Sequence, residues 1–584
     1  MRRVLLACLS ASCADAGPRL PFDLVDEAEA RGLSHANRSG GPKKATILEA
    51  NGAGVALLDL ERDGDLDVVL AQGLSSLTEL CAGGGTDIDV FLNDGAARFT
   101  RTPGPGLSGW WTGLATGDVD GDGDADLVAG GFGRLVVLVQ QDGGELAPAA
   151  ELVSAPSSPA PPWITSLALF DADRDGHLDL YAGLYLDLDP CAPPLGALGD
   201  GALAVPCEWK GLAVYCGPRG LSPQADRMWR GRGDGSFEEL DPARLGAAPA
   251  GYTLAVAPFD ADGDGDTDLA VAADSSPNLL LIGDGAGAFR ELAYAAGVAL
   301  GADGRPQAGM GIAVGDVDRD GRFDLAITNF SDEPTELHLG ADVGFTQATY
   351  RYGLSRETQR LLSWSAHLAD FDGDGWLELF TANGHVYPQA DEPNTGTSYG
   401  QPDTLWHLGP EPRARPAGGA RAGSLLAAPL GSRGSALGDL DGDGAPDLVV
   451  TRIDGPTALG LARGGAARRL AVRCLGPRAD PPGARSADPT GAPRTPADGM
   501  GTRLVLVVAA TGGEFALLDE VQTARGYQSA STPWSHFGLG ERGTPLRLFV
   551  CWPSTREETL EGLRAGERIW IREGEGIVRR EELR

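Results

Sequence analysis

The 584-residue sequence predicts an all-β chain, a seven-bladed β-propeller followed by a small β-sandwich-like domain. One acidic nonamer, D-x-D-x-D-G-x-x-D with small departures, recurs seven times, and a short apolar run follows it. The copies begin at residues 59, 118, 171, 260, 316, 370 and 439. Apart from one long interval, this spacing of roughly 55–70 residues accommodates the four strands of one propeller blade. Beyond residue 500 the nonamer is absent and other strand-like segments follow, which indicates a second domain.

The nonamers, called loops 1 to 7 here, carry acids at positions one, three, five and nine. In loops 1 to 4 these acids are Asp59, Glu61, Asp63 and Asp67; Asp118, Asp120, Asp122 and Asp126; Asp171, Asp173, Asp175 and Asp179; Asp260, Asp262, Asp264 and Asp268. In loops 5 to 7 they are Asp316, Asp318, Asp320 and Asp324; Asp370, Asp372, Asp374 and Glu378; Asp439, Asp441, Asp443 and Asp447. Position seven varies freely: Asp65, Asp124, His177, Asp266, Arg322, Trp376 and Ala445. This variety predicts that position seven binds through its main-chain carbonyl only.

Four carboxylates within nine residues repel one another, by roughly 3–4 kcal/mol for each close pair at an effective dielectric near 20. A bound cation removes this repulsion, and the glycine at position six permits the tight turn that gathers the oxygens. The sequence therefore predicts up to seven Ca²⁺ ions. Solvated turns are the alternative, and Mg²⁺ is disfavoured because it demands stricter octahedral geometry. An EF-hand is excluded because position twelve is never Glu and a strand-like run follows the loop.

The chain divides into four predicted parts. Residues 1–16 resemble an export signal, and a lipoprotein-type signal with Cys13 as the lipid site is one option; the alternative is a disordered tail. The propeller is predicted over residues 22–465, with an insertion at about 187–230 inside the long interval. Residues 466–500 are predicted as a linker or an irregular start of the C-terminal domain, which follows at 501–584. Two-residue Asp-Gly turns predict a second hairpin in the blades.

The cysteines favour an exported protein. Beyond Cys8 and Cys13, the remaining six form an even set, of which Cys191, Cys207 and Cys216 cluster in the insertion. Cys81 is the candidate fourth partner of that cluster, and its pairing is left open. Cys474 and Cys551, near the C-terminus, are expected to be able to pair across a sheet. Zinc binding is disfavoured because the sequence has no CxxC motif.

Charge argues against a nucleic-acid partner, and hydropathy argues against a membrane-spanning helix. The net charge of −34, with no basic stripe, argues against nucleic acid. No apolar run approaches the ~20 residues of a membrane-spanning helix, so no transmembrane helix is expected in the mature chain. The sequence thus predicts a secreted, periplasmic or outer-surface protein, with a lipid anchor at Cys13 as an option.

Several short segments outside the acidic loops resemble one known family. They are 52–56, 216–221, 310–313, 328–331, 383–388 and 433–436 in the propeller, and 501–503, 526–529, 536–540 and 552–554 in the C-terminal domain. With the loops, they make the chain similar to FG-GAP/VCBS-repeat propellers of the integrin-alpha-like type that end in an ASPIC/UnbV domain. This is the arrangement of the cartilage acidic protein family and its bacterial relatives. The resemblance implies calcium binding and an extracytoplasmic location rather than a particular activity.

Two functional classes follow. The first, which we favour, is a surface binding or adhesion module for an unknown extracellular protein or glycan. The second is an enzyme, such as a propeller-based polysaccharide lyase or hydrolase. No nucleophile elbow, HExxH or P-loop motif is present, so no catalytic residue is predicted. An accessory role in a biosynthetic or secretion pathway rests on family naming alone.

Overall fold

The computed structural model describes residues 22–155, 160–192, 207–417, 424–464, 468–477 and 492–584. The predicted export signal at 1–16, with Cys13, lies outside this range. The regular secondary structure of the described part is almost entirely β-strand, which confirms the predicted all-β class. None of its helices is long and apolar enough to cross a membrane.

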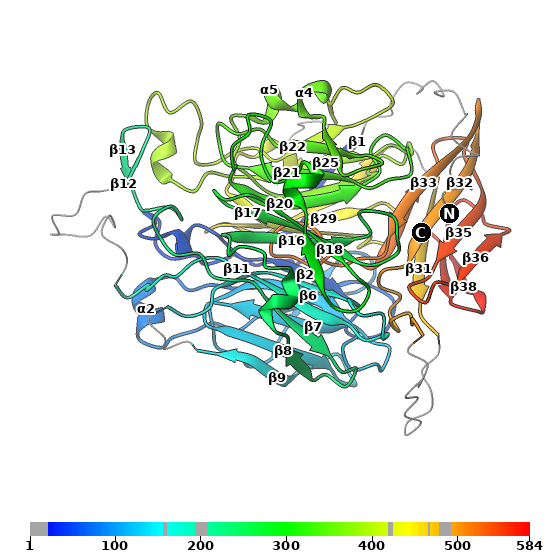
Figure 1. Cartoon of the computed structure of the whole chain (residues 1–584), viewed down its shortest axis with the longest axis horizontal. Helices are drawn as coiled ribbons and strands as arrows, with labels where there is room; N and C mark the ends of the chain where they lie inside the picture. Colours follow the sequence, from blue (N-terminus) through cyan, green and yellow to red (C-terminus); the bar gives the residue numbers. More distant parts are fainter. Residues whose placement is uncertain (1–21, 156–159, 193–206, 418–423, 465–467, 478–491) are drawn as a thin grey trace.

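Seven four-stranded antiparallel sheets form the propeller in the described part of the chain (Figure 1). The first sheet contains β2 (Val55–Leu58), β3 (Asp67–Leu70), β4 (Asp89–Asn93) and β5 (Phe99–Thr102). The second contains β6 (Trp111–Gly117), β7 (Asp126–Gly131), β8 (Arg134–Gln140) and β9 (Leu146–Ser154). The third contains β10 (Ile164–Phe170), β11 (Asp179–Leu184), β14 (Arg227–Gly231) and β15 (Phe237–Glu239). The fourth contains β16 (Thr253–Phe259), β17 (Asp268–Ala273), β18 (Leu279–Gly283) and β19 (Phe289–Glu291). The fifth contains β20 (Gly309–Gly315), β21 (Asp324–Asn329), β22 (Glu336–Gly340) and β23 (Phe345–Gln347). The sixth contains β24 (Ser363–Ala369), β25 (Glu378–Asn383), β26 (Thr404–His407) and β27 (Arg415–Pro416). The seventh contains β28 (Ser432–Gly438), β29 (Asp447–Arg452), β30 (Ala458–Gly464) and β1 (Phe22–Asp26).

The first strands of these sheets surround a common axis. They contact one another in the order β2, β6, β10, β16, β20, β24 and β28, and β28 contacts β2 again, so the ring is closed. Apolar side chains fill the space between neighbouring sheets. At the seam between the last and first sheets, Leu57 and Val68 pack with Leu459 and Leu461 in one buried cluster.

The last sheet takes its outer strand from the start of the described chain. β1 pairs with β30 in an antiparallel register that sets Leu24 opposite Ala462. A sheet built from both ends of the propeller ties the ring together, because separating the ends would expose a row of backbone hydrogen-bonding groups.

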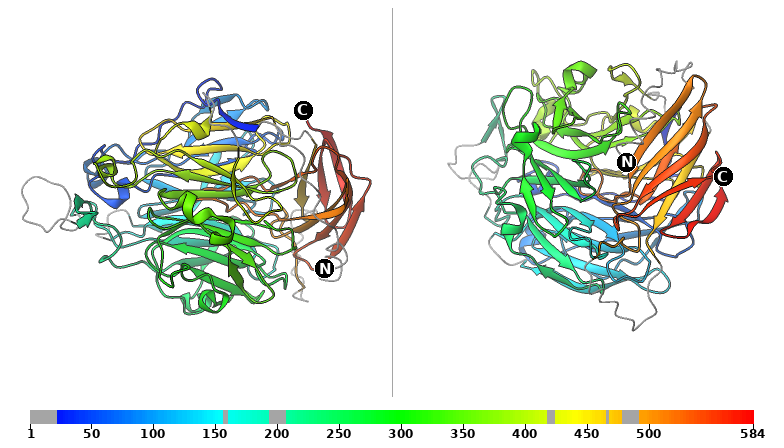
Figure 2. Two further views of the ribbon diagram at one scale, coloured as in Figure 1. Left: turned by 90° about the horizontal axis from the view of Figure 1, so that it is seen from above. Right: turned by 45° about the vertical axis from the view of Figure 1, so that its right-hand side comes forward.

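Short α-helices and one β-hairpin lie outside the propeller sheets. The helices are α2 (Leu77–Cys81), α3 (Ala293–Ala296), α4 (Thr349–Tyr352) and α5 (Leu354–Thr358). The insertion leaves the third sheet after Leu184 and ends where the chain returns to that sheet in β14, which begins at Arg227. The predicted end at about 230 therefore lies inside a blade strand. Between them lies the hairpin β12 (Cys207–Trp209) and β13 (Leu212–Val214). This hairpin and the C-terminal domain lie at opposite ends of the molecule (Figure 2).

Two disulfides hold the insertion. Cys81 at the end of α2 bonds to Cys191, and Cys207 bonds to Cys216 around the β12–β13 hairpin. The expected cluster of four disulfide cysteines is therefore correct. The expected pairing of Cys474 with Cys551 is wrong: both are thiols, and they lie on strands of different sheets.

The C-terminal domain is a sandwich of two four-stranded sheets (Figure 1). One sheet has the order β34 (Trp534–Gly538), β31 (Arg469–Leu475), β37 (Glu567–Arg572), β38 (Gly576–Glu582). The other has the order β33 (Gly513–Glu520), β32 (Arg503–Ala510), β35 (Thr544–Cys551), β36 (Glu557–Glu561). β31 lies inside the predicted linker at 466–500, so that boundary needs correction. The domain begins before residue 501 because β31 pairs in parallel with β37, about a hundred residues later.

A segment of the sandwich enters the axis of the propeller. Residues 521–532, between β33 and β34, are buried except for Arg525. Their main chain bonds to the innermost strands: Leu57 N donates to Ala530 O, and Leu114 N donates to Gln528 O, both at 3.0 Å. We call this the axial segment. The C-terminal domain is thus anchored inside the propeller as well as against one end of it.

Candidate metal centres

Each acidic loop is the turn between the first and second strands of its sheet. Position one directly follows the first strand and position nine begins the second, as Asp59 follows β2 and Asp67 begins β3. This agrees with the predicted strand–loop–strand context. Position six has positive φ in all seven loops, for example +94° at Gly64. Position four also has positive φ in every loop and is Gly or Arg, a feature that we did not predict.

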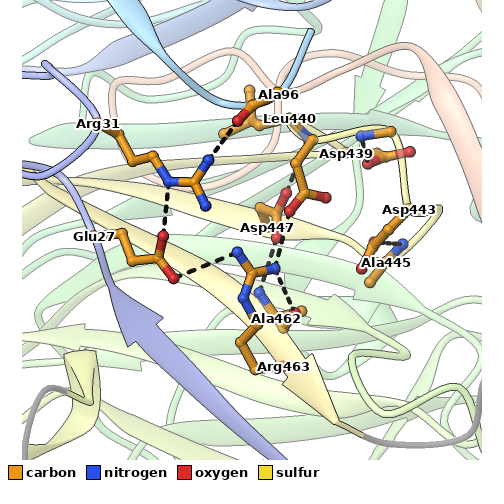
Figure 3. A network of polar contacts seen from close by, with 12 residues as sticks. Glu27, Arg31, Ala96, Asp439, Leu440, Asp443, Ala445, Asp447, Ala462 and Arg463 are labelled. Carbon is orange, nitrogen blue, oxygen red and sulfur yellow. Dashed lines mark hydrogen bonds and ion pairs between the residues drawn. The ribbon is translucent and has the colours of Figure 1, made fainter. Parts of the chain in front are cut away.

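The position-six glycine has a second role. In six loops its N–H donates to the position-one carboxylate at 2.7–3.0 Å, as Gly123 does to Asp118. Position nine, at the start of the second strand, links the loop to the third strand: Asp67 accepts from Leu60 N in the loop and from Asn93 N on β4, both at 2.8 Å. Hydrogen bonds to main-chain donors thus fix the first and last acids of the loop. In Figure 3, Asp439, Asp443 and Asp447 of loop 7 show the same arrangement.

The structure brings the predicted ligands together. In loops 2, 5 and 6 one carboxylate oxygen from each of positions one, three and five lies within 4.8 Å of the others. In loops 3 and 4 the same holds for positions one, three and nine. Three position-three oxygens, Oδ1 of Asp173, Asp318 and Asp441, are buried without a hydrogen-bond partner among the described residues. Buried carboxylate oxygens of this kind need a cation or a proton.

Electrostatics agree with a cation. Burial, together with repulsion from neighbouring carboxylates, raises the pKa of Asp118 and Asp316 to about 8 and that of Asp439 to about 7. A divalent ion would hold these groups ionised instead. The donor set of carboxylate and carbonyl oxygens fits Ca²⁺, which takes six to eight oxygen ligands.

Arginines also approach several predicted ligands. Their guanidinium nitrogens lie 2.5–3.1 Å from the carboxylates in four pairs: Arg230 with Asp173, Arg503 with Asp260, Arg322 with Asp320, and Arg463 with Asp441. Arg463 also reaches Glu27, which Arg31 contacts in turn (Figure 3). Arg322 is predicted to contribute its main-chain carbonyl, and its side chain pairs with Asp320 of its own loop.

The side chains at position seven of three loops contact an arginine at position four of the preceding loop. Arg62, at position four of loop 1, pairs with Asp124 at position seven of loop 2. Arg174 of loop 3 pairs with Asp266 of loop 4 at 2.5 Å. Arg319 of loop 5 lies 3.6 Å above the ring of Trp376 in loop 6. In loops 1, 3 and 5 the arginine at position four therefore connects one loop to the next.

Loop 6 has a neighbouring histidine, His407, that the sequence analysis did not predict. Its position-nine Glu378 accepts from Phe371 N at 2.9 Å and lies 2.7 Å from Nδ1 of His407, on β26. His407 Nε2 is 3.8 Å from Asp374 Oδ2. The longer side chain of Glu378 allows its carboxylate to contact His407. In the other loops the shorter position-nine Asp accepts a hydrogen bond from a main-chain N–H of the third strand.

The C-terminal domain covers this loop-bearing end of the propeller. Arg503 on β32 connects Asp260 of loop 4 with the carbonyl of Gly321 in loop 5. Arg469 on β31 donates to the carbonyls of Asp370 and Phe371 in loop 6, at 2.9 and 2.8 Å. The loops therefore form the surface on which the sandwich docks.

Family models match two parts of the chain. FG-GAP-like repeats match residues 76–129, 118–182, 214–271 and 260–327, and the model described as ASPIC and UnbV matches 492–578. Cartilage acidic protein 1 of Xenopus tropicalis is 25% identical over 291 residues, which are 48% of this chain and 38% of that protein. The Mus musculus protein is 26% identical over the same shares. The matched region thus spans less than half of these relatives.

Solved structures with a similar fold include an Agrocybe aegerita lectin that recognises non-reducing terminal N-acetylglucosamine. It has a TM-score of 0.37 and 14% identity, and the match covers 68% of this chain and 85% of the lectin. The β-propeller domain of Myceliophteria thermophila Cps50 has a TM-score of 0.37 and 10% identity, over 73% and 98% of the two chains. From the family models and the curated relatives, the chain is an FG-GAP-repeat protein with an ASPIC and UnbV domain, distantly related to cartilage acidic protein 1.

Proposed function

We propose that this protein is an extracytoplasmic calcium-binding repeat protein that acts as a surface binding or adhesion module for a protein or glycan ligand. The buried, unpartnered position-three oxygens of loops 3, 5 and 7 carry the calcium part of the proposal. They lie in loops whose other acids are held by main-chain N–H groups. Such a fixed set of hard oxygen donors is suited to a divalent ion.

Calcium in this position has a structural role. The loops lie between the propeller and the sandwich, and Arg503 and Arg469 contact their carboxylates or carbonyls. Ions in the loops reduce the repulsion among the acids and fix the carbonyls that these arginines use. Calcium would therefore hold the docking surface in shape.

The two disulfides support a location outside the cytoplasm, because such bonds persist in oxidising compartments. A lipid anchor at Cys13 stays a prediction. Binding is favoured over catalysis because the axis, where propeller enzymes commonly place their chemistry, holds the axial segment.

Elemental analysis of the purified full chain tests the calcium part. We expect several calcium ions per molecule, lost in excess chelator, with other divalent metals at trace level. A protein free of divalent metal after dialysis against about 1 mM calcium would refute the proposal. A screen of extracellular proteins and glycans, with and without chelator, tests the binding part.

A further inference from the structure

A solvent-accessible cleft of about 220 Å³ separates loops 1 and 2 from the C-terminal sandwich. Asp59 and Arg62 of loop 1 and Asp124 of loop 2 line the propeller side. Trp534, Trp570 and Arg579 line the sandwich side. Elsewhere on this end of the propeller, Arg503 and Arg469 connect the sandwich directly to the loops. The cleft is therefore a gap within a docked interface, and pockets at domain interfaces are common ligand sites.

Strand register gives the sandwich wall a regular composition. Trp534, Arg473, Trp570 and Arg579 stand opposite one another on four neighbouring strands, β34, β31, β37 and β38. Residues in register across a sheet lie on the same face, so the four form one row. The two indole rings meet edge to face with centroids 4.9 Å apart, and the Arg579 guanidinium lies 4.3 Å from the Trp570 centroid.

Both tryptophans are partly exposed, although the opposite face of the same sheet is a closed core of residues such as Val472, Ile569 and Ile571. Burying an indole ring normally stabilises a domain interface. Trp534 and Trp570 instead line the cleft and stay partly exposed, which makes them a candidate surface for a ligand.

Each of the three arginines around the cleft has a partner within the protein and keeps further N–H groups for a ligand. Arg62 pairs with Asp124, and Arg579 pairs with Glu581. Arg473 donates to the carbonyls of Cys474 and Asp498. The cleft thus offers planar hydrogen-bonding groups beside aromatic rings with little net charge, in a protein whose formal charge is −34.

We propose that this cleft binds one or two sugar rings of a neutral glycan, a proposal that rests on the proposed binding function and specifies its ligand. The apolar C–H face of a pyranose ring would pack on the tryptophans, and its hydroxyl groups would bond to the guanidinium and carboxylate groups. An acidic glycan is disfavoured by the overall charge. A protein ligand is disfavoured at this site because a standard protein interface needs about 800 Å² per partner, far more than the cleft provides.

Calcium should control this binding. One wall of the cleft consists of loops 1 and 2, and the side chains of Arg62 and Asp124 join these loops. Loss of ions from the two loops would change the position of that wall relative to the tryptophans.

The test uses the full chain in about 1 mM calcium, with an array of neutral oligosaccharides and, as the opposing arm, oligosaccharides of uronic acids. Affinity for the strongest neutral probe is then measured by titration of tryptophan fluorescence. We expect Trp534→Ala and Trp570→Ala each to weaken binding about tenfold or more, since one well-placed aromatic anchor contributes at least this much. Trp209→Ala is the matched control, because Trp209 lies on the β12–β13 hairpin at the opposite end of the molecule.

Calcium stoichiometry of each variant separates the two proposals. A wild-type protein that binds calcium but no neutral oligosaccharide would overturn the glycan site and leave the calcium proposal standing. Tighter binding of the acidic array, or an affinity equal to that of the wild-type protein in both tryptophan variants, would also overturn it. If a tryptophan variant fails to fold, Arg579→Ala replaces it, because the Arg579 side chain is 54% exposed. Unchanged affinity in that variant would count against the site.

Discussion

Removal of calcium should destabilise the propeller measurably. A site with a Kd of ~10⁻⁴ M in about 1 mM calcium stabilises the folded state by about 1.4 kcal/mol. Seven independent sites of this affinity would contribute about 10 kcal/mol. In loops 3, 4, 5 and 7 a guanidinium within 3.1 Å of a predicted ligand would partly replace the ion. Counting only loops 1, 2 and 6 in full gives a lower figure of about 4 kcal/mol.

The assay is differential scanning calorimetry of the full chain in calcium and in excess chelator. With an unfolding entropy of about 2.1 cal/mol/K per residue, a loss of 4–10 kcal/mol lowers the melting temperature by about 3–8 °C. Excess magnesium added to the chelated sample should restore little of this loss, because Mg²⁺ retains its water. Melting temperatures that agree within about 1 °C in calcium and in chelator would refute the structural role.

Further predictions concern single groups. Asp318→Ala removes a buried, unpartnered oxygen of loop 5 and should lower the calcium stoichiometry by one while the chain still folds; an unchanged stoichiometry in calorimetric titration would contradict it. Burial raises the pKa of Asp118 to about 8, so in chelator the folded protein holds more protons than the unfolded chain between about pH 4 and 8. Its stability should therefore fall as pH rises through that window, and a chelated melting temperature that is higher at pH 8 than at pH 5 would exclude this. Cys81→Ser opens the disulfide to Cys191 and should cost about 2–4 kcal/mol in urea unfolding, with no change in calcium stoichiometry.

The sequence was sufficient for the features that are local. The nonamer places its acids, its glycine and the start of the next strand within nine residues, so its turn could be predicted without knowledge of distant partners. Position four was missed because its signal is split between Gly and Arg. The arginine at this position has its partner in the next loop, as Arg174 has in Asp266, and a single repeat gives no indication of that contact.

The features that depend on distant pairing could not be predicted in the same way. β31 lies among residues rich in Pro and Gly, and only its pairing with β37 assigns it to the sandwich. The axial segment contains Gly526 and Tyr527, which carried the family resemblance without revealing their location. His407 contacts Glu378 because β26 is the neighbour of β25, a relation set by the sheet and not by the motif.

The seam between the last and first sheets shows how the loops, the sandwich and the ring depend on one another. Loop 7 has Gly442 at position four, so it lacks the arginine with which loops 1, 3 and 5 reach the next loop. Arg584, just beyond β38, fills this place: its N–H donates to Gly442 O at 2.8 Å, its guanidinium donates to Gly95 O, and it lies 3.9 Å from Asp65 of loop 1.

At this seam the sandwich therefore supplies, with Arg584, the positively charged side chain that is missing at position four of loop 7. Arg584→Ala should weaken the contact between sandwich and propeller there, because it removes the guanidinium contacts with the Gly95 carbonyl and the Asp65 carboxylate and leaves only the main-chain bond to Gly442 O. We expect faster amide hydrogen exchange in β38 and around loop 7, with no change around loop 4, where Arg503 is intact. Uniformly faster exchange over both loops would instead indicate that the variant loosens the whole interface, and unchanged exchange at loop 7 would show that Arg584 does not support the seam.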